Sequence, residues 1–148
     1  MNSHRYLRAF PAGAFVTTLI LPLILTGFII LRLVLEVPFP FERGLVFPMA
    51  LVPSLWAVWN MLWLGSHSRT QLPIGAHGAL LPVLILPCGA TLATGLGILS
   101  LGQSGVTWFH TFHIPYTVIA GFFLGALAGY YLAWKYIVGF LNRTLEIA

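Results

Sequence analysis

Three long stretches without a charged side chain constrain how this chain folds more than any other feature. There are 23 uncharged residues between Arg8 and Arg32, 25 between Arg43 and Arg69, and 65 between Arg69 and Lys135. A helix needs about 20 apolar residues to cross a hydrocarbon layer about 30 Å thick. The first two stretches therefore each hold one membrane span, and the third holds two spans with a loop between them. Charged residues make up only 7% of the chain, against about 25% in soluble domains, which excludes an ordinary soluble fold.

The sequence thus predicts an all-α integral membrane protein with one domain, in which four transmembrane helices form an antiparallel bundle. The expected spans are residues 9–37, 45–64, 72–101 and 114–140. Backbone polar groups in hydrocarbon must be satisfied within their own segment, and the chain has no series of alternating strands about ten residues long, so we expect helices and not a barrel. The first span is longer than the apolar core of a signal peptide and lacks a small-residue cleavage site, so we expect it to be retained.

The orientation follows from the distribution of lysine and arginine, which are enriched in cytoplasmic loops. Five basic residues fall on one side of the predicted membrane and two on the other. The first group is Arg5, Arg8, Arg69, Lys135 and Arg143, and the second is Arg32 and Arg43. We therefore expect both termini to be cytoplasmic, in a membrane of the bacterial inner (cytoplasmic) type.

Small residues recur every four positions in the third and fourth predicted spans. Gly121, Gly125 and Gly129 fall on one face of the last span, and Gly89, Ala93 and Gly97 form a similar ridge on the span before it. Missing side chains let another helix approach closely, which drives helix association in lipid. We expect these two faces to pack against each other within the chain; the alternative is that one of them faces a partner subunit or a second copy.

Tryptophans gather toward the predicted cytoplasmic side. Trp56, Trp59 and Trp63 fall on one side of the second span, and Trp134 lies near the end of the fourth. Aromatic side chains are enriched at the headgroup level of membranes. We interpret these four residues as an interfacial belt, with a pigment or quinone pocket as the alternative.

Histidines are the main candidates for binding a cofactor or a metal. His77, which lies among small residues, is a candidate axial ligand for a haem or a chlorophyll-type pigment, and His113 is a second one. His110 and His113 would share a helix face if the last span began there, and they would form a metal site with further ligands such as Glu36 or Glu42. The competing interpretation is that these histidines have interfacial or capping roles.

Catalytic chemistry finds little support in the sequence. The chain has no aspartate and no acidic residue between Arg43 and Leu145, so it lacks the mid-membrane carboxylate that proton relays and ion-coupled transporters generally need. Residues 102–105 (Gly-Gln-Ser-Gly) resemble the nucleophile motif of rhomboid intramembrane proteases, but they fall in a predicted loop and the chain has too few spans for that family. We predict no catalytic residue.

The most economical functional prediction is a non-catalytic accessory or scaffold subunit of a larger membrane complex, whose partners are lipid and other membrane subunits or itself. One alternative is an electron-transfer subunit that binds haem, chlorophyll or quinone, and another is a small oligomeric transporter or channel. The basic residues are scattered between apolar runs and form no continuous stripe, which argues against nucleic-acid binding.

Overall fold

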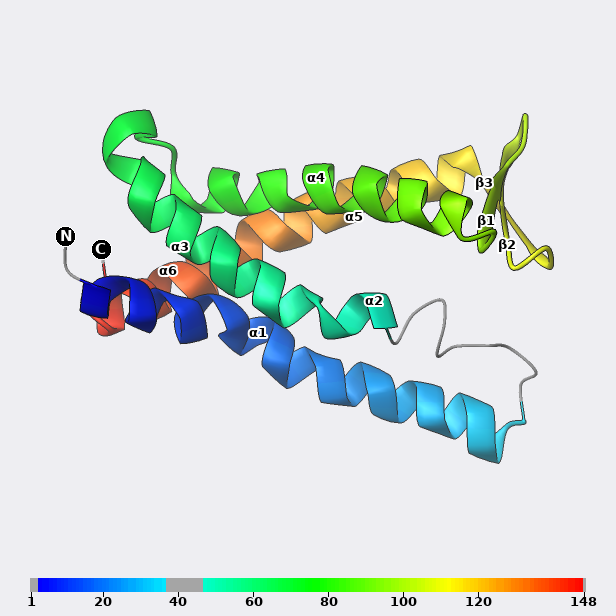
Figure 1. Ribbon diagram of the computed structural model, residues 1–148, viewed down its shortest axis with the longest axis horizontal. Helices are drawn as coiled ribbons and strands as arrows, with labels where there is room; N and C mark the ends of the chain where they lie inside the picture. Colours follow the sequence, from blue (N-terminus) through cyan, green and yellow to red (C-terminus); the bar gives the residue numbers. More distant parts are fainter. Residues whose placement is uncertain (1–2, 37–46, 148) are drawn as a thin grey trace.

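The computed structural model describes residues 3–36 and 47–147, which are mostly helical (Figure 1). Its helical elements are α1 (Ser3–Ile29), η1 (Ile30–Val34), α2 (Phe47–Ala50), α3 (Val52–Thr70), α4 (Ile74–Gly95), α5 (Tyr116–Leu132), η3 (Ala133–Val138) and α6 (Gly139–Thr144). The π-helical segments η1 and η3 continue α1 and α5 without a break. Residues 37–46 hold the end of the first predicted span and the start of the second, and they lie outside the described residues, as does Glu42.

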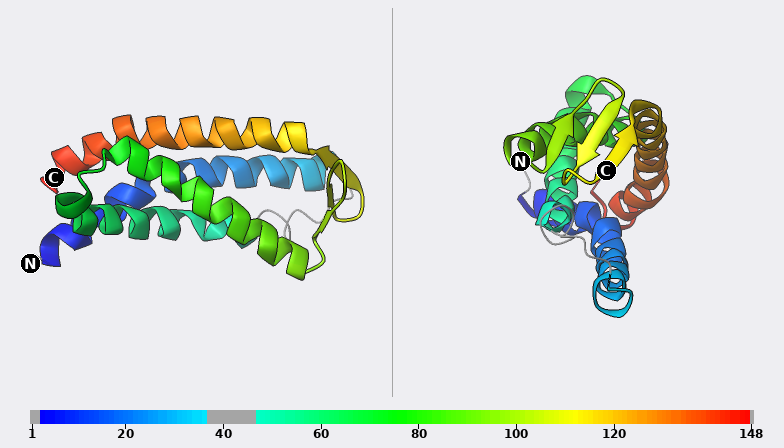
Figure 2. Two further views of the ribbon diagram at one scale, coloured as in Figure 1. Left: turned by 90° about the horizontal axis from the view of Figure 1, so that it is seen from above. Right: turned by 90° about the vertical axis from the view of Figure 1, so that its right-hand side faces the viewer.

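The helices associate as two pairs. α1 packs along α3, and α4 packs along α5 and η3. Near the end that carries both termini, η3 and α6 contact α1, which joins the two pairs (Figures 1 and 2). Toward the opposite end α1 runs away from the α4–α5 pair.

The buried core lies in the half of the molecule that carries the termini. One cluster contains Val16, Trp56, Leu81, Trp134 and Val138, and a second contains Ala9, Ala12 and Ile147. α5 contains no buried residue. The other half of the helices therefore exposes large apolar side chains, an arrangement typical of a chain surrounded by lipid or by other proteins.

Three helical stretches are long and apolar enough to cross a membrane: His4–Val34, Ile74–Gly95 and Tyr116–Thr144. They correspond to the first, third and fourth predicted spans. α3 is 19 residues long, about 28 Å at 1.5 Å per residue, but it is less apolar because it carries residues such as Asn60 and the polar run Ser66–Thr70. It ends six residues beyond the predicted Leu64, where Gln71 adopts a left-handed conformation (φ 48°) and its N–H donates to the His67 carbonyl.

α4 ends earlier than predicted, at Gly95 instead of Leu101. The N–H of Ile98 donates to the Ala93 carbonyl and the N–H of Gly97 to the Thr94 carbonyl, which is the hydrogen-bond pattern of a Schellman motif. Gly97 has φ +68°, a conformation that glycine adopts at little cost. The predicted packing role of Gly97 is therefore wrong, because this residue terminates the helix.

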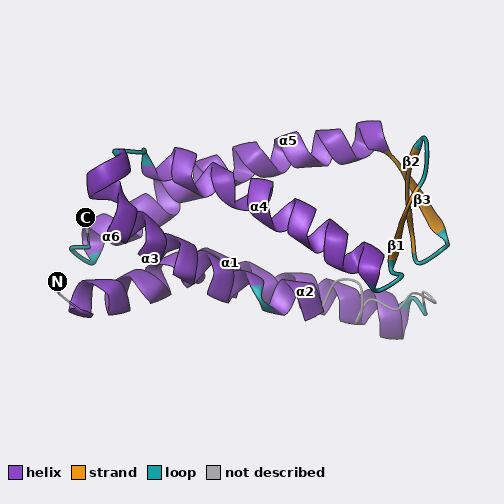
Figure 3. Cartoon of the chain, turned by 45° about the horizontal axis from the view of Figure 1, so that its top comes forward, coloured by secondary structure: helices purple, strands orange, loops and turns teal. Residues whose placement is uncertain are grey.

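The connection between α4 and α5 adds a small element that the sequence analysis did not predict to an otherwise helical chain. It forms a three-stranded antiparallel sheet with the order β1-β2-β3, made of β1 (Leu99–Leu101), β2 (Gly105–Trp108) and β3 (Phe112–Pro115). The sheet closes the ends of α4 and α5 (Figure 3). Its register aligns Ser100, Thr107 and His113 in one cross-strand row, and the neighbouring rows are apolar. Directly paired residues project to the same face, so the sheet has one polar and one apolar face.

Candidate functional site in the aromatic core and on the α5 face

His77 lies in the aromatic core and is bound to Trp59 in two ways. Its Nε2–H donates to the Trp59 carbonyl oxygen at 3.1 Å, and the Trp59 indole Nε1–H donates to the His77 carbonyl oxygen at 2.8 Å. The two rings stack with centroids 4.6 Å apart. His77 is 7% exposed. This histidine holds α3 against α4 and keeps only Nδ1 for any further ligand.

Two tryptophans beside His77 fill the centre of the molecule. The ring centroids of Trp56 and Trp134 are 5.5 Å apart, and Tyr130 lies 4.8 Å from Trp56. Trp56 is 3% exposed and Trp134 is fully buried, and their indole N–H groups have no hydrogen-bond partner among the described residues. The positions of the two tryptophans are therefore determined by apolar packing of their rings and not by hydrogen bonds of their indole N–H groups.

The four tryptophans predicted to form an interfacial belt pack against other helices of the chain. Trp56, Trp63 and Trp134 are buried inside the helix packing, and Trp59 is half-buried against it. The spacing that places three of the rings on one side of α3 is real, but that side faces the other helices. An amphipathic ring is equally suited to a protein interior when its apolar part finds neighbours.

A pair of asparagines joins three helices below the aromatic core. Asn60 Nδ2 donates to Asn142 Oδ1 and Asn142 Nδ2 donates to Asn60 Oδ1, both at 2.9 Å, and Asn60 Nδ2 also donates to the Ala9 carbonyl at 2.9 Å. Both side chains are almost completely buried. Interhelical hydrogen bonds of this type favour one arrangement of membrane helices over others. The pair links α1, α3 and α6.

The tight helix contacts of the chain use glycines that the sequence analysis did not assign to packing. A Cβ atom on Gly13 would lie 2.6 Å from the Trp56 carbonyl oxygen, and a Cβ atom on Gly78 would lie 2.1 Å from Trp134 Cγ. Real Cβ atoms do not approach other atoms so closely, so α1 meets α3 and α4 meets η3 only because these positions lack side chains. Neither glycine belongs to a regular four-residue repeat, which is the signal that the sequence analysis used.

The predicted packing of the two small-residue ridges against each other is wrong. A Cβ atom on Gly89, Gly121, Gly125 or Gly129 would meet no other atom within 4 Å. The partly buried residues of α5 are Ile119, Phe123, Ala126, Leu127 and Tyr130. At about 100° per residue, the three glycines of α5 lie roughly 140° around the helix from this partly buried face. The glycine ridge therefore faces away from α4 and is uncovered in the isolated chain.

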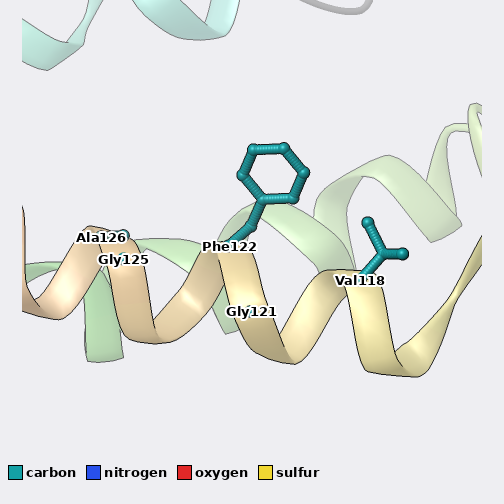
Figure 4. Close-up of a pocket in the computed structure, with 5 residues that line it drawn as sticks. All are labelled: Val118, Gly121, Phe122, Gly125 and Ala126. Atoms are coloured by element: carbon teal, nitrogen blue, oxygen red, sulfur yellow. The ribbon is translucent and has the colours of Figure 1, made fainter.

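A shallow hollow follows this ridge. It is lined by Val118, Gly121, Phe122, Gly125 and Ala126, all from α5, and its surface is almost wholly apolar. Figure 4 shows Val118 and Phe122 projecting to the same side of the helix, with bare backbone at the glycines. The hollow is open along its length, so an apolar ligand or helix bound there would contact α5 on one side only.

The last span does not begin at His110 and His113, so the two histidines do not share a helix face. His110 occupies the turn between β2 and β3 with φ +59°, and His113 belongs to β3. His113 Nε2 lies 3.4 Å from Ser104 Oγ, and both residues are exposed. Across residues 3–36 and 47–147, no three histidine, cysteine or acidic side chains come together as metal ligands would. Ser104, in the turn before β2, thus makes a polar contact with His113 of β3.

Comparisons with protein families, with curated proteins and with solved structures find no match for this chain. Its function must therefore be argued from its own geometry.

Proposed function

We propose that this chain is a non-catalytic accessory or scaffold subunit of a larger complex in the bacterial cytoplasmic membrane. In this proposal α3 also crosses the membrane, as the second of four spans, and both termini are cytoplasmic. The single observation that carries the proposal is the uncovered glycine ridge of α5. Close packing between helices is the main use of such ridges in membranes, and this chain does not use the ridge itself.

The distribution of buried residues supports the same proposal. The half of the molecule that carries the termini has a packed core, while α5 contributes no fully buried residue. In lipid, helices gain little from merely hiding apolar surface and associate through close contacts between small residues. A partner helix against Gly121, Gly125 and Gly129 would supply the contacts that α5 lacks.

The electron-transfer alternative has less support. A haem or chlorophyll-type ligand would have to reach His77, a residue that is 7% exposed and whose ring is stacked on Trp59. The apolar hollow of α5 lies away from this histidine, and its five lining residues include none that ligates a metal. The transporter alternative rests on the prolines inside two of the described helices, Pro11 and Pro22 in α1 and Pro82 and Pro87 in α4.

The test separates packing within the chain from packing against a partner. Because a Cβ atom on Gly125 would meet no other described residue within 4 Å, we expect Gly125→Leu to leave the unfolding free energy of the isolated protein unchanged or to raise it by up to about 1 kcal/mol, since leucine favours a helix more than glycine does. The same substitution should remove the partner subunit from the complex extracted in mild detergent from the native host. Native mass spectrometry measures the second effect, and denaturation in mixed micelles measures the first.

Ala120→Leu is the matched control. Ala120 is also a small, exposed residue of α5, but it lies roughly 140° around the helix from Gly125. This variant should keep both the stability and the partner. If Gly125→Leu retained the whole complex, the proposal would be wrong. In the native mass spectrum of the wild type, an added cofactor mass on the isolated chain would favour electron transfer, and a homo-oligomer without other subunits would favour transport.

A further inference from the structure

Five basic residues lie in the half of the molecule that carries both termini. They come from four elements that end or lie there: α1, α3, η3 and α6 (Figure 1). The residues are Arg5, Arg8, Arg69, Lys135 and Arg143. Among the described residues of this end, Glu146 is the acidic one, so the five positive charges less one negative charge leave a net charge of +4. We call these five residues the basic end.

Among the described residues, Arg5, Arg8 and Lys135 of the basic end contact groups without a net charge. Arg5 Nη2 donates to the Ile147 carbonyl, and Arg8 Nη1 donates to the Leu145 carbonyl at 3.4 Å. The Lys135 ammonium lies over the rings of Tyr131 and Tyr136, 5.6 and 5.1 Å from their centroids. Backbone carbonyls and tyrosine rings carry no net charge, so the cations keep their attraction for anions.

The depth of Lys135 along its helix matches a membrane boundary. Lys135 follows Tyr116 by 19 residues, which is about 28 Å at 1.5 Å per residue and close to the hydrocarbon thickness of about 30 Å. If the sheet end of α5 lies at one boundary, Lys135 lies at the other. Gly75, in the first turn of α4, lies at the same level, because a Cβ atom there would be 3.1 Å from Lys135 Cβ.

We propose that the basic end binds the headgroups of anionic phospholipids in the leaflet beside both termini, with Lys135 and Arg143 as its principal contacts. A lysine at this depth keeps its stem along apolar surface while its ammonium reaches phosphate. Arg143 follows Lys135 by two turns and is exposed, which places it farther toward the headgroups. The charges surround the ends of apolar helices, which suits a lipid surface better than a nucleic acid or an acidic protein.

This inference rests on the membrane placement in the proposed function but not on the partner subunit. Native mass spectrometry of the full chain in detergent, with phosphatidylglycerol and phosphatidylcholine added in equal amounts, tests it. We expect phosphatidylglycerol to be retained preferentially. Each cation near an anionic surface contributes about fivefold in affinity, so Lys135→Gln and Arg143→Gln should each weaken retention about fivefold and the double variant about 25-fold.

Two controls make the result decisive. Arg32→Gln removes one charge from the opposite end and should leave the preference unchanged, and Lys135→Arg should retain it because the charge is kept. An equal loss in Arg32→Gln, or full retention in the double variant, would overturn the inference. Competition by inorganic phosphate at the concentration of the lipid would also overturn it, since that would indicate a general anion site. Gly125→Leu should still bind the lipid, which separates this inference from the proposed partner.

Discussion

Asn60 and Asn142 illustrate how two single side chains determine the way helices meet. Each amide donates to the other, and Asn60 also donates to the Ala9 carbonyl. In a buried environment an amide without a partner is costly, so the pair is favourable only when α1, α3 and α6 are in register. The sequence shows Asn60 as a polar residue within a span, but it gives no indication that its partner lies 82 residues away.

We expect the two amides to act as a unit. Asn60→Ala should destabilise the protein more than Asn142→Ala, because it also removes the hydrogen bond to Ala9. Interhelical hydrogen bonds in membranes contribute about 0.6 to 1.7 kcal/mol, so the double variant should be less destabilised than the sum of the two single variants by about this amount. Denaturation in mixed micelles, followed by tryptophan fluorescence, measures the cycle. Additive effects would mean that the two amides do not interact.

His77 shows why a residue type alone does not identify a site. The sequence correctly places this histidine among small residues, which a bound ring and a packed side chain both require. The structure fills the space beside Gly78 with Trp134 and stacks His77 on Trp59. Whether a cofactor ring or a packed side chain fills this space depends on residues from α3 and η3, which are distant in the sequence.

Among the helices, α4 contains two glycines that appear equivalent in the sequence and differ in the structure. A Cβ atom on Gly78 would overlap Trp134, and a Cβ atom on Gly89 would meet nothing within 4 Å. We expect Gly78→Ala to lower the free energy of unfolding by about 1 to 3 kcal/mol, the usual cost of overpacking. Gly89→Ala is the control and should be neutral or stabilising by up to about 1 kcal/mol, because alanine favours the helix.

Thermal unfolding of the two variants in the same detergent provides the comparison. A smaller side chain at position 134 should partly restore Gly78→Ala, since the overlap is with the indole ring. Trp134→Leu combined with Gly78→Ala tests this point. If Gly89→Ala were the more destabilising of the two single variants, the contact between α4 and η3 described above would be incorrect.

The sequence predicted the long helices well because the spacing of charges reflects the thickness of a membrane, and three of the four expected spans correspond to helices able to cross one. It missed the sheet because the strands are short and their turn is unusual. Phe109 and His110 both have positive φ, and the Thr111 N–H donates to the Trp108 carbonyl. Such turns normally carry asparagine or glycine. The phenylalanine and histidine found here therefore do not predict a turn from the sequence.

The whole molecule has a packed end and an open end. Aromatic rings, the asparagine pair and the C-terminal Ile147 fill the end with the termini, while α1 separates from the α4–α5 pair toward the other. Ile147 is fully buried against Ala9 and Ala12, and Arg5 and Arg8 bind carbonyls of the same segment. The two termini are therefore held together, which requires an even number of crossings if the chain spans a membrane.

This arrangement leads to a prediction about topology. With Cys88→Ala as the background, Ser68→Cys and Thr144→Cys should react with a membrane-impermeant maleimide from the cytoplasmic side, and Gln103→Cys from the opposite side. All three positions are exposed, so their reactivity reports the side of the membrane and not burial. In intact cells only Gln103→Cys should be labelled, and in inverted vesicles only the other two. Labelling of Ser68→Cys and Thr144→Cys from opposite sides would mean that an odd number of spans separates them, and the placement of α4 and α5 as two spans would then be wrong.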